Sequence, residues 1–360
     1  MILGSPNVTP MTSQVDADLR ASEPRCPASS THAAPPAALV TVKPHRRSLP
    51  LRVGSRASPL ALWQTRDFLR ILTRFCPVLR GLDAFQEHAM STTGDRVQDR
   101  RLAEIGGKGL FAKEVHEALL DGRIDFAVHS LKDLETTLPD GIVLACVLPR
   151  EDARDALVLG MDAPFTGSDD PYAVLRQGAV IGTSSVRRQA QLLHARPDLR
   201  CTLIRGNVQS RLAKVRDDQY DASLLALAGL RRMELEHEAS VIFDPDVMVP
   251  SAGQGIVGVT VRACDTELLE LVAAIEDPVA RAVSSAERSM LAVLDGSCAT
   301  PIGGHARIID GTLHLTGLVA RADGSFLLKQ SVSGAPADAA RIGIELGHSL
   351  RRDCPSDVFA

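Results

Sequence analysis

The sequence predicts an α/β protein with largely parallel sheets, followed by a smaller α+β domain at the C-terminal end. From residue 51 onward, short apolar runs typical of strands alternate with segments whose apolar residues recur at helical spacing. After residue 300 the pattern changes to longer segments typical of antiparallel strands. They are separated by Asp310–Gly311 and Asp323–Gly324, which are typical of hairpin turns. A length of 360 residues suggests two or three domains.

The first 50 residues are expected to be a disordered tail. They hold 8 of the 21 prolines and no Phe, Tyr or Trp, so they cannot bury enough apolar surface to offset the entropy of ordering. They lack the unbroken apolar region of a secretory signal. Asp16, Asp18 and Glu23 argue against an organellar transit peptide, although Arg46 and Arg47 leave that alternative open.

The elements behind the tail follow in order. The first strand is expected at 51–55, and the helix after Pro59 presents an apolar face of Leu60, Trp63, Leu69 and Leu72. Further strands are expected at 125–130, 142–148, 156–160 and 180–183, with helices at 112–120, 186–194 and 208–216. Residues 161–171 are expected to form a loop. The last domain is expected to contain strands at 305–309, 312–320 and 325–333 and a helix at about 337–351.

Composition excludes several classes of partner. The 40 basic residues nearly offset the 44 acidic ones, and the resulting net charge of −4 gives no general attraction to nucleic acid or anionic membrane. The chain has only 9 Phe, 2 Tyr and 1 Trp, which disfavours stacking on bases. No apolar stretch reaches the roughly 18 residues of a membrane span. The seven cysteines include no CxxC pair, so we expect neither a disulfide framework nor a metal site, and a reducing compartment.

Two segments share a pattern that favours anion binding. Residues 180–189 (VIGTSSVRRQ) and 201–212 (CTLIRGNVQSRL) each join an apolar strand to a helix through small polar residues. Ser184 or Ser185, and Asn207, can cap a helix whose free N–H groups favour an anion. Fork-shaped donors that suit carboxylate or phosphate are Arg187, Arg188, Arg205 and Arg211. For either segment alone, a capped helix with arginines on its solvated face is a simpler interpretation than an anion-binding site. Two in tandem favour an anionic small molecule, because ligands of such sheets bind beyond the carboxyl ends of the strands.

Two further segments carry groups suited to a substrate site. Residues 106–113 (GGKGLFAK) are rich in glycine but lack the spacing of a phosphate-binding P-loop. We expect a mobile loop with Lys108 and Phe111 at its tip, able to close over a ligand. Residues 129–133 (HSLKD) end an apolar strand with a lysine beside an aspartate. Such a carboxylate can hold a cationic intermediate, although an isolated surface pair of this kind contributes only about 0–1 kcal/mol.

Cys298 differs from the other cysteines in its surroundings. It lies in residues 295–304 (DGSCATPIGG), a loop punctuated by glycine and proline, and a loop cysteine is accessible to react. Most lone cysteines are small buried hydrophobic residues. Apart from His305, nothing close in the sequence offers an activating base.

Nine strings together resemble one family. LRVGSRASPLALWQ, TTGD, GGKGLF, AVHSLKD, GTSSVRRQ, RGNVQSRL, LALAGLRR, SAGQGIVG and GSCATPIG appear in this order between residues 51 and 303. They resemble the porphobilinogen deaminase (hydroxymethylbilane synthase) family. The resemblance implies two α/β domains of periplasmic-binding-protein type around a central cleft, and a small C-terminal α+β domain. The implied division is a tail at 1–50, a first domain at 51–150 to which 256–274 return, a second at 151–250, and a third at 278–360.

The resemblance also implies the cofactor and the site. Cys298 would carry a dipyrromethane cofactor through a thioether, and Asp133 would contact pyrrole nitrogens and stabilise the cationic intermediate. The residues that would bind carboxylates of cofactor and substrate, or line the cleft beside them, are Arg56, Ser58, Lys132, Thr183, Ser184, Ser185, Arg187, Arg188, Arg205, Gly206, Arg211 and Arg232. Lys108 and Phe111 would belong to an active-site loop, and no metal is implied.

The implied reaction joins four porphobilinogen molecules head to tail with loss of ammonia, and water then releases hydroxymethylbilane. The implied protein is a cytoplasmic monomer with porphobilinogen as its partner. Two strings depart from the family pattern: Leu134–Glu135 follow the aspartate where proline is usual, and Gly296–Ser297 replace a glycine pair. A solute-binding protein would use the same two-lobed cleft without catalysis, but it does not explain Cys298, and such proteins normally carry a secretion signal, which is not seen here. A regulatory anion sensor is the second alternative, and no helix-turn-helix or basic stripe supports it.

Overall fold

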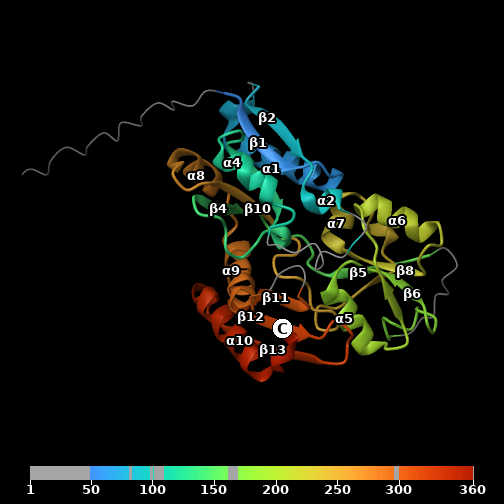
Figure 1. Ribbon diagram of the computed structural model, residues 1–360. Coiled ribbons are helices and arrows are strands. Elements are labelled where there is room, and N and C mark those ends of the chain that lie inside the picture. The colour runs from blue at the N-terminus through green and yellow to red at the C-terminus, as the bar shows by residue number, and fades with distance from the viewer. Residues whose placement is uncertain are drawn as a thin grey trace, which may run out of the picture. The chain divides into compact units, whose positions relative to one another are not determined.

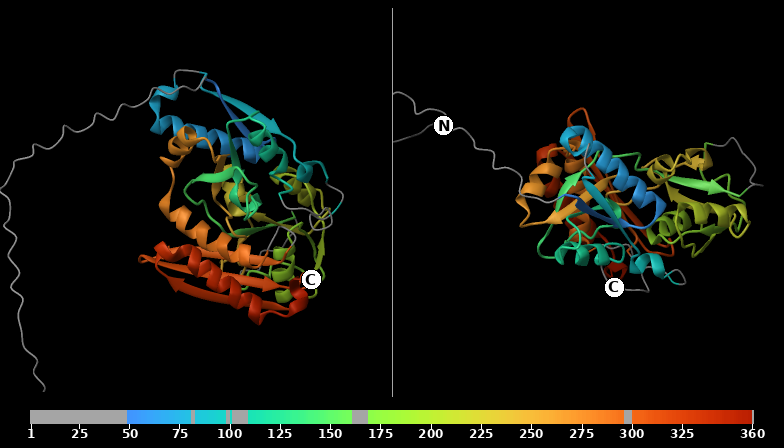
Figure 2. Two further views of the ribbon diagram at one scale, coloured as in Figure 1. Left: turned by 60° about the vertical axis from the view of Figure 1, so that its left-hand side comes forward. Right: turned by 90° about the horizontal axis from the view of Figure 1, so that it is seen from above.

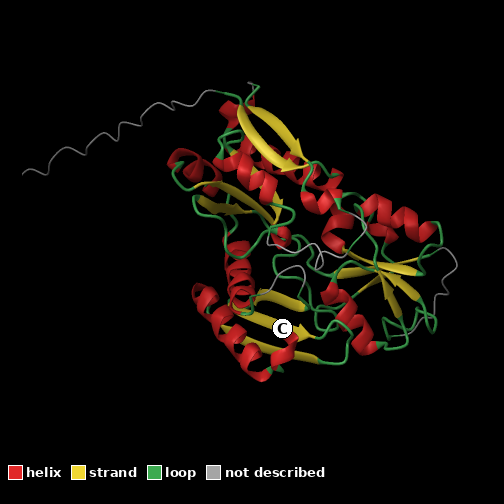
Figure 3. Cartoon of the chain, viewed as in Figure 1, coloured by secondary structure: helices red, strands yellow, loops and turns green. Residues whose placement is uncertain are grey.

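The computed structural model describes residues 49–80, 83–97, 100, 109–160, 169–295 and 300–359, and within them it contains three sheets (Figures 1 and 3). Residues 1–48 of the expected tail, most of the loop at 161–171, Lys108 and Cys298 lie outside these residues. The mixed α/β layers and the separate small C-terminal α+β domain that the sequence predicts are confirmed.

The first sheet has helices on both faces. Its strand order is β2 (Phe85–Met90), β1 (Leu51–Arg56), β3 (Phe126–Ser130), β10 (Val257–Arg262) and β4 (Ile142–Val147). The helices beside it are α1 (Pro59–Phe75), α4 (Lys113–Leu120) and α8 (Thr266–Ala273). Successive strand residues point to opposite faces, so Phe126 and Val128 pack with α1 and α8 while Ala127 packs with α4.

The second sheet repeats this arrangement. Its order is β7 (Arg200–Thr202), β6 (Val180–Gly182), β8 (Ala222–Ala226), β5 (Asp155–Leu159) and β9 (Val241–Ile242). The helices beside it are α5 (Val186–Ala195), α6 (Val208–Arg216) and α7 (Leu227–Arg232). Leu157 packs with Leu192 of α5 on one face, whereas Ala156 and Val158 pack with Leu212 of α6 on the other.

The prediction of largely parallel sheets needs one correction in each sheet. Strand β10 is antiparallel to β3 and β4, and β5 is antiparallel to β8 and β9. These are the strands that the chain enters directly from the other sheet, through residues 148–154 and 243–256. A chain that leaves one sheet at the carboxyl edge of its strands enters the facing sheet at the same kind of edge, and therefore runs backward through it. Strand β10 and helix α8 thus pack with the first sheet although they follow the second in sequence.

The third sheet is antiparallel, in the order β11 (Ile302–Ile309), β12 (Thr312–Ala320) and β13 (Leu327–Gly334). Asp310 and Gly311 both have positive φ, 48° and 76°, as the predicted tight hairpin requires. Helices α9 (Pro278–Val293) and α10 (Ala339–Asp353) lie beside this sheet (Figure 2). They share one core with it, through residues such as Met290 of α9, Leu346 of α10 and Leu315 of β12. The short helices among the described residues are α2 (Thr93–Arg96) and the 3-10 segments Pro77–Arg80, Leu131–Asp133, Glu236–Glu238, Pro336–Asp338 and Ser356–Phe359.

One local prediction was wrong, and not every strand was predicted. Trp63 was expected on the buried face of α1, but it is 38% exposed, and the buried face includes the polar Gln64 and Thr65. Gln64 accepts a hydrogen bond from Ser130 Oγ (3.0 Å), so hydrophobicity alone could not locate this face. Strand β2 was missed because it is an edge strand whose sequence, FQEHAM, is only partly apolar.

Candidate functional site

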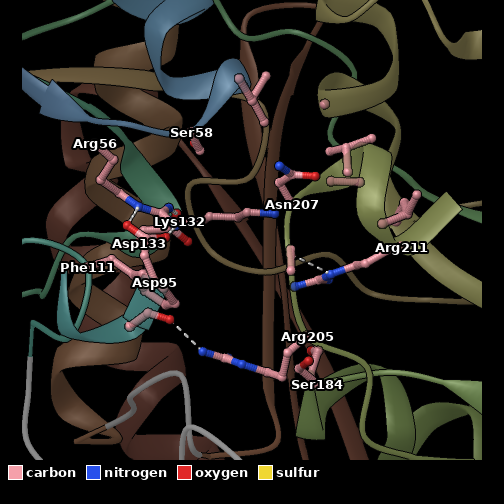
Figure 4. Close-up of a pocket in the computed structure, with 18 of the residues that line it drawn as sticks. Arg56, Ser58, Asp95, Phe111, Lys132, Asp133, Ser184, Arg205, Asn207 and Arg211 are labelled. Atoms are coloured by element: carbon pink, nitrogen blue, oxygen red, sulfur yellow. Dashed lines mark hydrogen bonds and ion pairs between the residues drawn. The ribbon is translucent and has the colours of Figure 1, made fainter. Parts of the chain in front are cut away.

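A pocket of about 470 Å³ lies where loops from both five-stranded sheets meet (Figure 4). Its walls come mainly from segments that follow β1, β3, β6, β7 and β8. The expected site residues that line it are Arg56, Ser58, Phe111, Lys132, Asp133, Ser184, Ser185, Arg187, Arg188, Arg205, Gly206 and Arg211. These residues are far apart in sequence, and all except Phe111 meet because they lie at or after the carboxyl end of a strand.

Asp133 and Arg56 form an ion pair in the pocket. Arg56 Nη1 donates to Asp133 Oδ2 at 3.1 Å, and Arg56 also pairs with Asp95 of α2 (Figure 4). Burial acts against the charged form of Arg56, but the hydrogen bonds and charges of Asp95 and Asp133 outweigh it, so the pKa of Arg56 is raised. Arg56 therefore stays cationic and holds the Asp133 carboxylate in one place.

Phe111 occupies a different position from the one expected. It lies in the turn just before α4, and its ring centroid is 4.3 Å from Arg56 Cζ, which is a cation–π contact. The same ring lies so close to Gly94 that a Cβ there would come within 2.3 Å of it. Phe111 is thus packed inside the pocket wall and is not at the tip of a loop.

A buried carboxylate that the sequence did not single out holds the paired arginines. Asp155 Oδ2 accepts from Arg187 Nη1 at 2.6 Å, and Asp155 Oδ1 accepts from Arg188 Nη2 at 2.7 Å. Arg187 also donates to the Val249 carbonyl and Arg188 to the Leu224 carbonyl, both at 2.7 Å. The arginines are therefore buried in a network and do not lie on a solvated face. The available signal was an aspartate at the start of an otherwise apolar strand, DALVL.

We expect Asp155→Asn to lower the free energy of unfolding by about 3–5 kcal/mol, because two buried guanidinium groups lose their shared counter-charge. The two arginines hold the pKa of Asp155 well below its ordinary value of 3.8, against the effect of burial. Its stabilisation is therefore complete above pH 4 and is lost as the pH falls below that value, a loss the variant should not share. Urea unfolding at several pH values measures both effects. Asp357→Asn, which breaks an exposed pair with Arg321, is the matched control and should change little.

Lys132 lies beside Asp133 with its ammonium group in the pocket wall. Burial, reinforced by the charge of Arg188, lowers the pKa of Lys132 to about 8. Nζ donates to Gln254 Oε1 at 3.1 Å. An ammonium group in this setting is costly to keep charged, and a substrate carboxylate would stabilise it.

Two further cations face the pocket from the segment after β7. Arg205 Nη2 donates to the carbonyls of Gly94 (2.6 Å) and Val97 (3.0 Å), and its buried Nε has no hydrogen-bond partner among the described residues. Arg211 Nε donates to the Gly206 carbonyl at 2.9 Å. Burial and the charges of Arg188 and Arg205 lower the pKa of Arg211 to about 10. This side of the pocket is thus rich in donors for an anion.

The serines and Asn207 shape the same wall. Ser185 and Asn207 accept from backbone N–H groups at the starts of α5 and α6, as expected of helix caps. Ser184 Oγ donates to the Ile204 carbonyl and so links the two anion-binding segments. Two of the expected residues that the structure describes do not line the pocket: Thr183 is buried and accepts from the Ser185 N–H, and Arg232 donates to the Gly255 carbonyl at 2.7 Å.

Glu135, the departure after Asp133, is directed away from the pocket. Its Oε1 lies 3.2 Å from Nδ1 of the buried His116, and Arg288 donates to its carbonyl at 2.7 Å. Burial acts against its charged form, but His116 and the local hydrogen bonds prevail, so the pKa of Glu135 is lowered. Glu135 is not among the described residues that line the pocket, so its charge does not enter the substrate space.

Neither a metal centre nor a membrane span is found in the described part of the chain. No three of its His, Cys, Asp and Glu side chains are grouped so that they could bind a metal ion. None of its helices combines the length and the apolar character needed to cross a bilayer.

Comparison with known proteins matches nearly all of the chain after residue 50. Residues 51–270 match the family described as "Porphobilinogen deaminase, dipyromethane cofactor binding domain", and residues 282–352 match "Porphobilinogen deaminase, C-terminal domain". Among solved structures, the substrate binding protein of an amino acid ABC transporter shows a weak likeness, with a TM-score of 0.35 and 15% identity over 62% of this chain and 90% of that one.

Curated relatives agree with these matches. Porphobilinogen deaminase of Paracoccus denitrificans is 47% identical over 315 residues, which are 86% of this chain and 96% of the relative. Porphobilinogen deaminase of Nitrobacter winogradskyi is 46% identical over 85% of this chain and 94% of the relative. The resemblance seen in the nine strings is therefore confirmed. The chain belongs to the porphobilinogen deaminase family.

Proposed function

We propose that this pocket condenses four porphobilinogen molecules head to tail, with loss of ammonia, on a dipyrromethane attached to Cys298, and that water then releases hydroxymethylbilane. As a member of its family the chain is a transferase of tetrapyrrole biosynthesis that uses a dipyrromethane cofactor. One observation supports the assignment of roles to these residues: Asp133 pairs with Arg56 in a pocket that five further cationic side chains line. Besides Arg56, these are Lys132, Arg187, Arg188, Arg205 and Arg211.

Asp133 is proposed to stabilise the cation that forms on the substrate. The protonated aminomethyl group of porphobilinogen leaves as ammonia with the electron pair of its C–N bond, and a positive charge remains on the pyrrole. A fixed carboxylate beside that charge lowers the barrier because it needs no reorganisation during the step. Arg56 supplies the fixation through its 3.1 Å hydrogen bond to Asp133.

The cationic walls suit the carboxylates of cofactor and substrate. Each pyrrole ring carries an acetate and a propionate, so the growing chain adds two negative charges at every step. Charge-assisted hydrogen bonds of about 1.5–3 kcal/mol each can bind them. When bound, the dipyrromethane supplies the free pyrrole carbon to which the first substrate is joined. Ser58, Ser184, Ser185 and Gly206, which line the pocket, are proposed to support these contacts, and Lys108 is proposed to act with Phe111 as part of the active-site loop. Thr183 and Arg232 do not line the pocket and are proposed to act only by supporting its wall.

The wider organisation is proposed on the same basis. The chain divides into a first domain at 51–150 completed by 256–274, a second at 151–250, and a third at 278–360 that carries the cysteine loop. The place of β10 and α8 beside the first sheet supports this division. The protein acts as a monomer in the cytoplasm, with porphobilinogen as its only required partner.

Incubation of the purified protein with limiting porphobilinogen, followed by intact-mass measurement, tests the proposal. A ladder of masses separated by one deaminated porphobilinogen unit is expected, together with release of ammonia and hydroxymethylbilane. A protein whose mass never changes while porphobilinogen remains intact would contradict the proposed function.

Arg211→Leu tests the carboxylate assignment. We expect KM for porphobilinogen to rise about 10- to 100-fold, because one charge-assisted hydrogen bond is lost. The protein should not become less stable through electrostatics, since burial already disfavours the charged form of Arg211. Arg216→Leu on the same helix removes an exposed arginine paired with Glu238 and is the matched control. An unchanged KM in Arg211→Leu would refute the role of this arginine.

A further inference from the structure

We propose that Gln254 is a positioning residue: its side-chain amide holds the ammonium group of Lys132 in the pocket wall and ties it to the carboxylate that holds Arg187 and Arg188. Gln254 is 1% exposed and lies in the segment through which the chain returns from the second sheet to the first. Nothing in its local sequence, SAGQGIVG, marks it as more than a residue of a glycine-rich turn. The inference rests on the proposed function for the role of Lys132 in the pocket.

The two ends of the Gln254 amide have unambiguous partners. Nε2 donates to the Ala153 carbonyl at 2.6 Å and to Asp155 Oδ1 at 2.8 Å. Both partners are acceptors only, so the nitrogen must face them and the oxygen must face the opposite way. The oxygen therefore meets Lys132 Nζ, a donor only, at 3.1 Å. A reversed amide would place a donor against an ammonium group and an acceptor against a carboxylate.

The backbone that carries this amide is held from several sides. The Gln254 carbonyl accepts from Arg150 Nε at 2.8 Å, and the Gly253 N–H donates to Glu287 Oε2 at 2.7 Å. Gly255 has a φ of 86°, and a Cβ there would lie 2.2 Å from the Glu151 carbonyl oxygen. This backbone cannot shift without breaking these contacts, so the Cα atom from which the Gln254 side chain extends is fixed in place.

Arg232 also contacts the backbone segment that carries Gln254. Arg232 was expected in the substrate pocket, but it donates to the Gly255 carbonyl at 2.7 Å. It thus supports the segment that carries Gln254. Arg232 therefore lies behind the pocket wall and helps to fix Gln254, which in turn positions Lys132.

Gln254 links Lys132 to the ion pairs of Arg187 and Arg188 with Asp155. Lys132 faces Arg188, Asp133, Asp155 and Arg187, which are the charged groups that act on its titration. Asp155 is the shared counter-charge of the two arginines, and through the Gln254 amide it also orients the lysine. Three cations then keep a fixed spacing, although Lys132 follows a strand of the first sheet and the arginines lie on α5 beside the second. A flexible lysine side chain would otherwise lose this position.

Competitive acetylation of Lys132 with acetic anhydride, read out by peptide mass spectrometry across pH, measures its pKa without any assay of activity. An amide oxygen that accepts from an ammonium group favours the charged form, so Gln254→Leu should lower the pKa of Lys132 by about one unit. Well below pH 7, where Lys132 is mostly charged in both proteins, its neutral fraction should then rise about tenfold, and the ratio should shrink as the pH approaches the pKa. In kinetics with porphobilinogen, the alkaline limb of kcat/KM should move to lower pH by the same amount.

Two further variants keep the test decisive. Gln191→Leu removes another buried glutamine, which bonds the backbone of Val249 and does not contact Lys132; it should leave the pKa of Lys132 unchanged. Gln254→Asn keeps an amide but is one methylene too short to join both partners, and it serves if the leucine variant does not fold. An unchanged pKa of Lys132 in the folded Gln254 variants overturns the inference. A lowered pKa with an unmoved kinetic limb would support the positioning of Lys132 and refute instead its proposed role with substrate.

Discussion

Replacing Asp133 by asparagine is expected to lower kcat at least about 100- to 1000-fold, the effect of removing one well-placed electrostatic group from an active site. The asparagine keeps the size of the side chain and can still accept from Arg56, so the pocket should keep its shape. What it lacks is the negative charge beside the cation that forms when ammonia leaves. Single-turnover measurement of ammonia release isolates this step, and KM should change much less than kcat.

Two variants separate charge from packing in this prediction. Asp133→Glu restores the carboxylate at a shifted position and should recover part of the rate. Asp95→Asn breaks the other ion pair of Arg56 and leaves Asp133 in place, so its loss of kcat should be far smaller. Equal losses in Asp95→Asn and Asp133→Asn would mean that the orientation of Arg56, and not the charge of Asp133, limits the reaction.

Cys298→Ala is expected to abolish covalent cofactor binding completely. The wild-type protein should have an intact mass above that of the bare chain by two linked pyrrole units, and the variant should have the mass of the bare chain. The thioether needs a sulfur atom, so no neighbouring side chain can replace it. Activity with porphobilinogen should be lost together with the added mass.

Cys264→Ala is the matched control, because Cys264 is exposed and outside the pocket wall. It should retain both the added mass and the activity. A wild-type protein with the mass of the bare chain, even after incubation with porphobilinogen, would show that the Cys298 loop does not carry the cofactor. The same would follow if Cys264→Ala lost the cofactor and Cys298→Ala kept it.

Local patterns predicted the strand–turn–helix segments well. Ser185 and Asn207 cap the helices that the sequence assigned to them, and the Asp310–Gly311 turn has the backbone conformation typical of its residues. Caps and tight turns are decided by neighbours within about four residues, so a reader of the sequence can see all the partners. The strings that carried the family resemblance are likewise short local segments and can be recognised one at a time.

The roles of the cleft arginines could be predicted only in part. Their type and their position after strands indicated an anion site, and Arg211 and Arg205 do face the pocket. The sequence could not show that Arg187 and Arg188 share Asp155, because that carboxylate lies 32 and 33 residues earlier in the chain. Nor could it show that Arg232 supports a turn behind the pocket wall.

By itself the sequence determined the alternation of strands and helices, the residue types of an anion-binding site, and the family, since each depends on short segments read one at a time. The tertiary structure alone decided which of these groups meet. Lys132 and Gln254 are 122 residues apart, and they touch because the chain crosses twice between two sheets and returns as β10 beside β3. Burial then gave these groups their energetics, because a charge removed from water must find its partner wherever the fold places one.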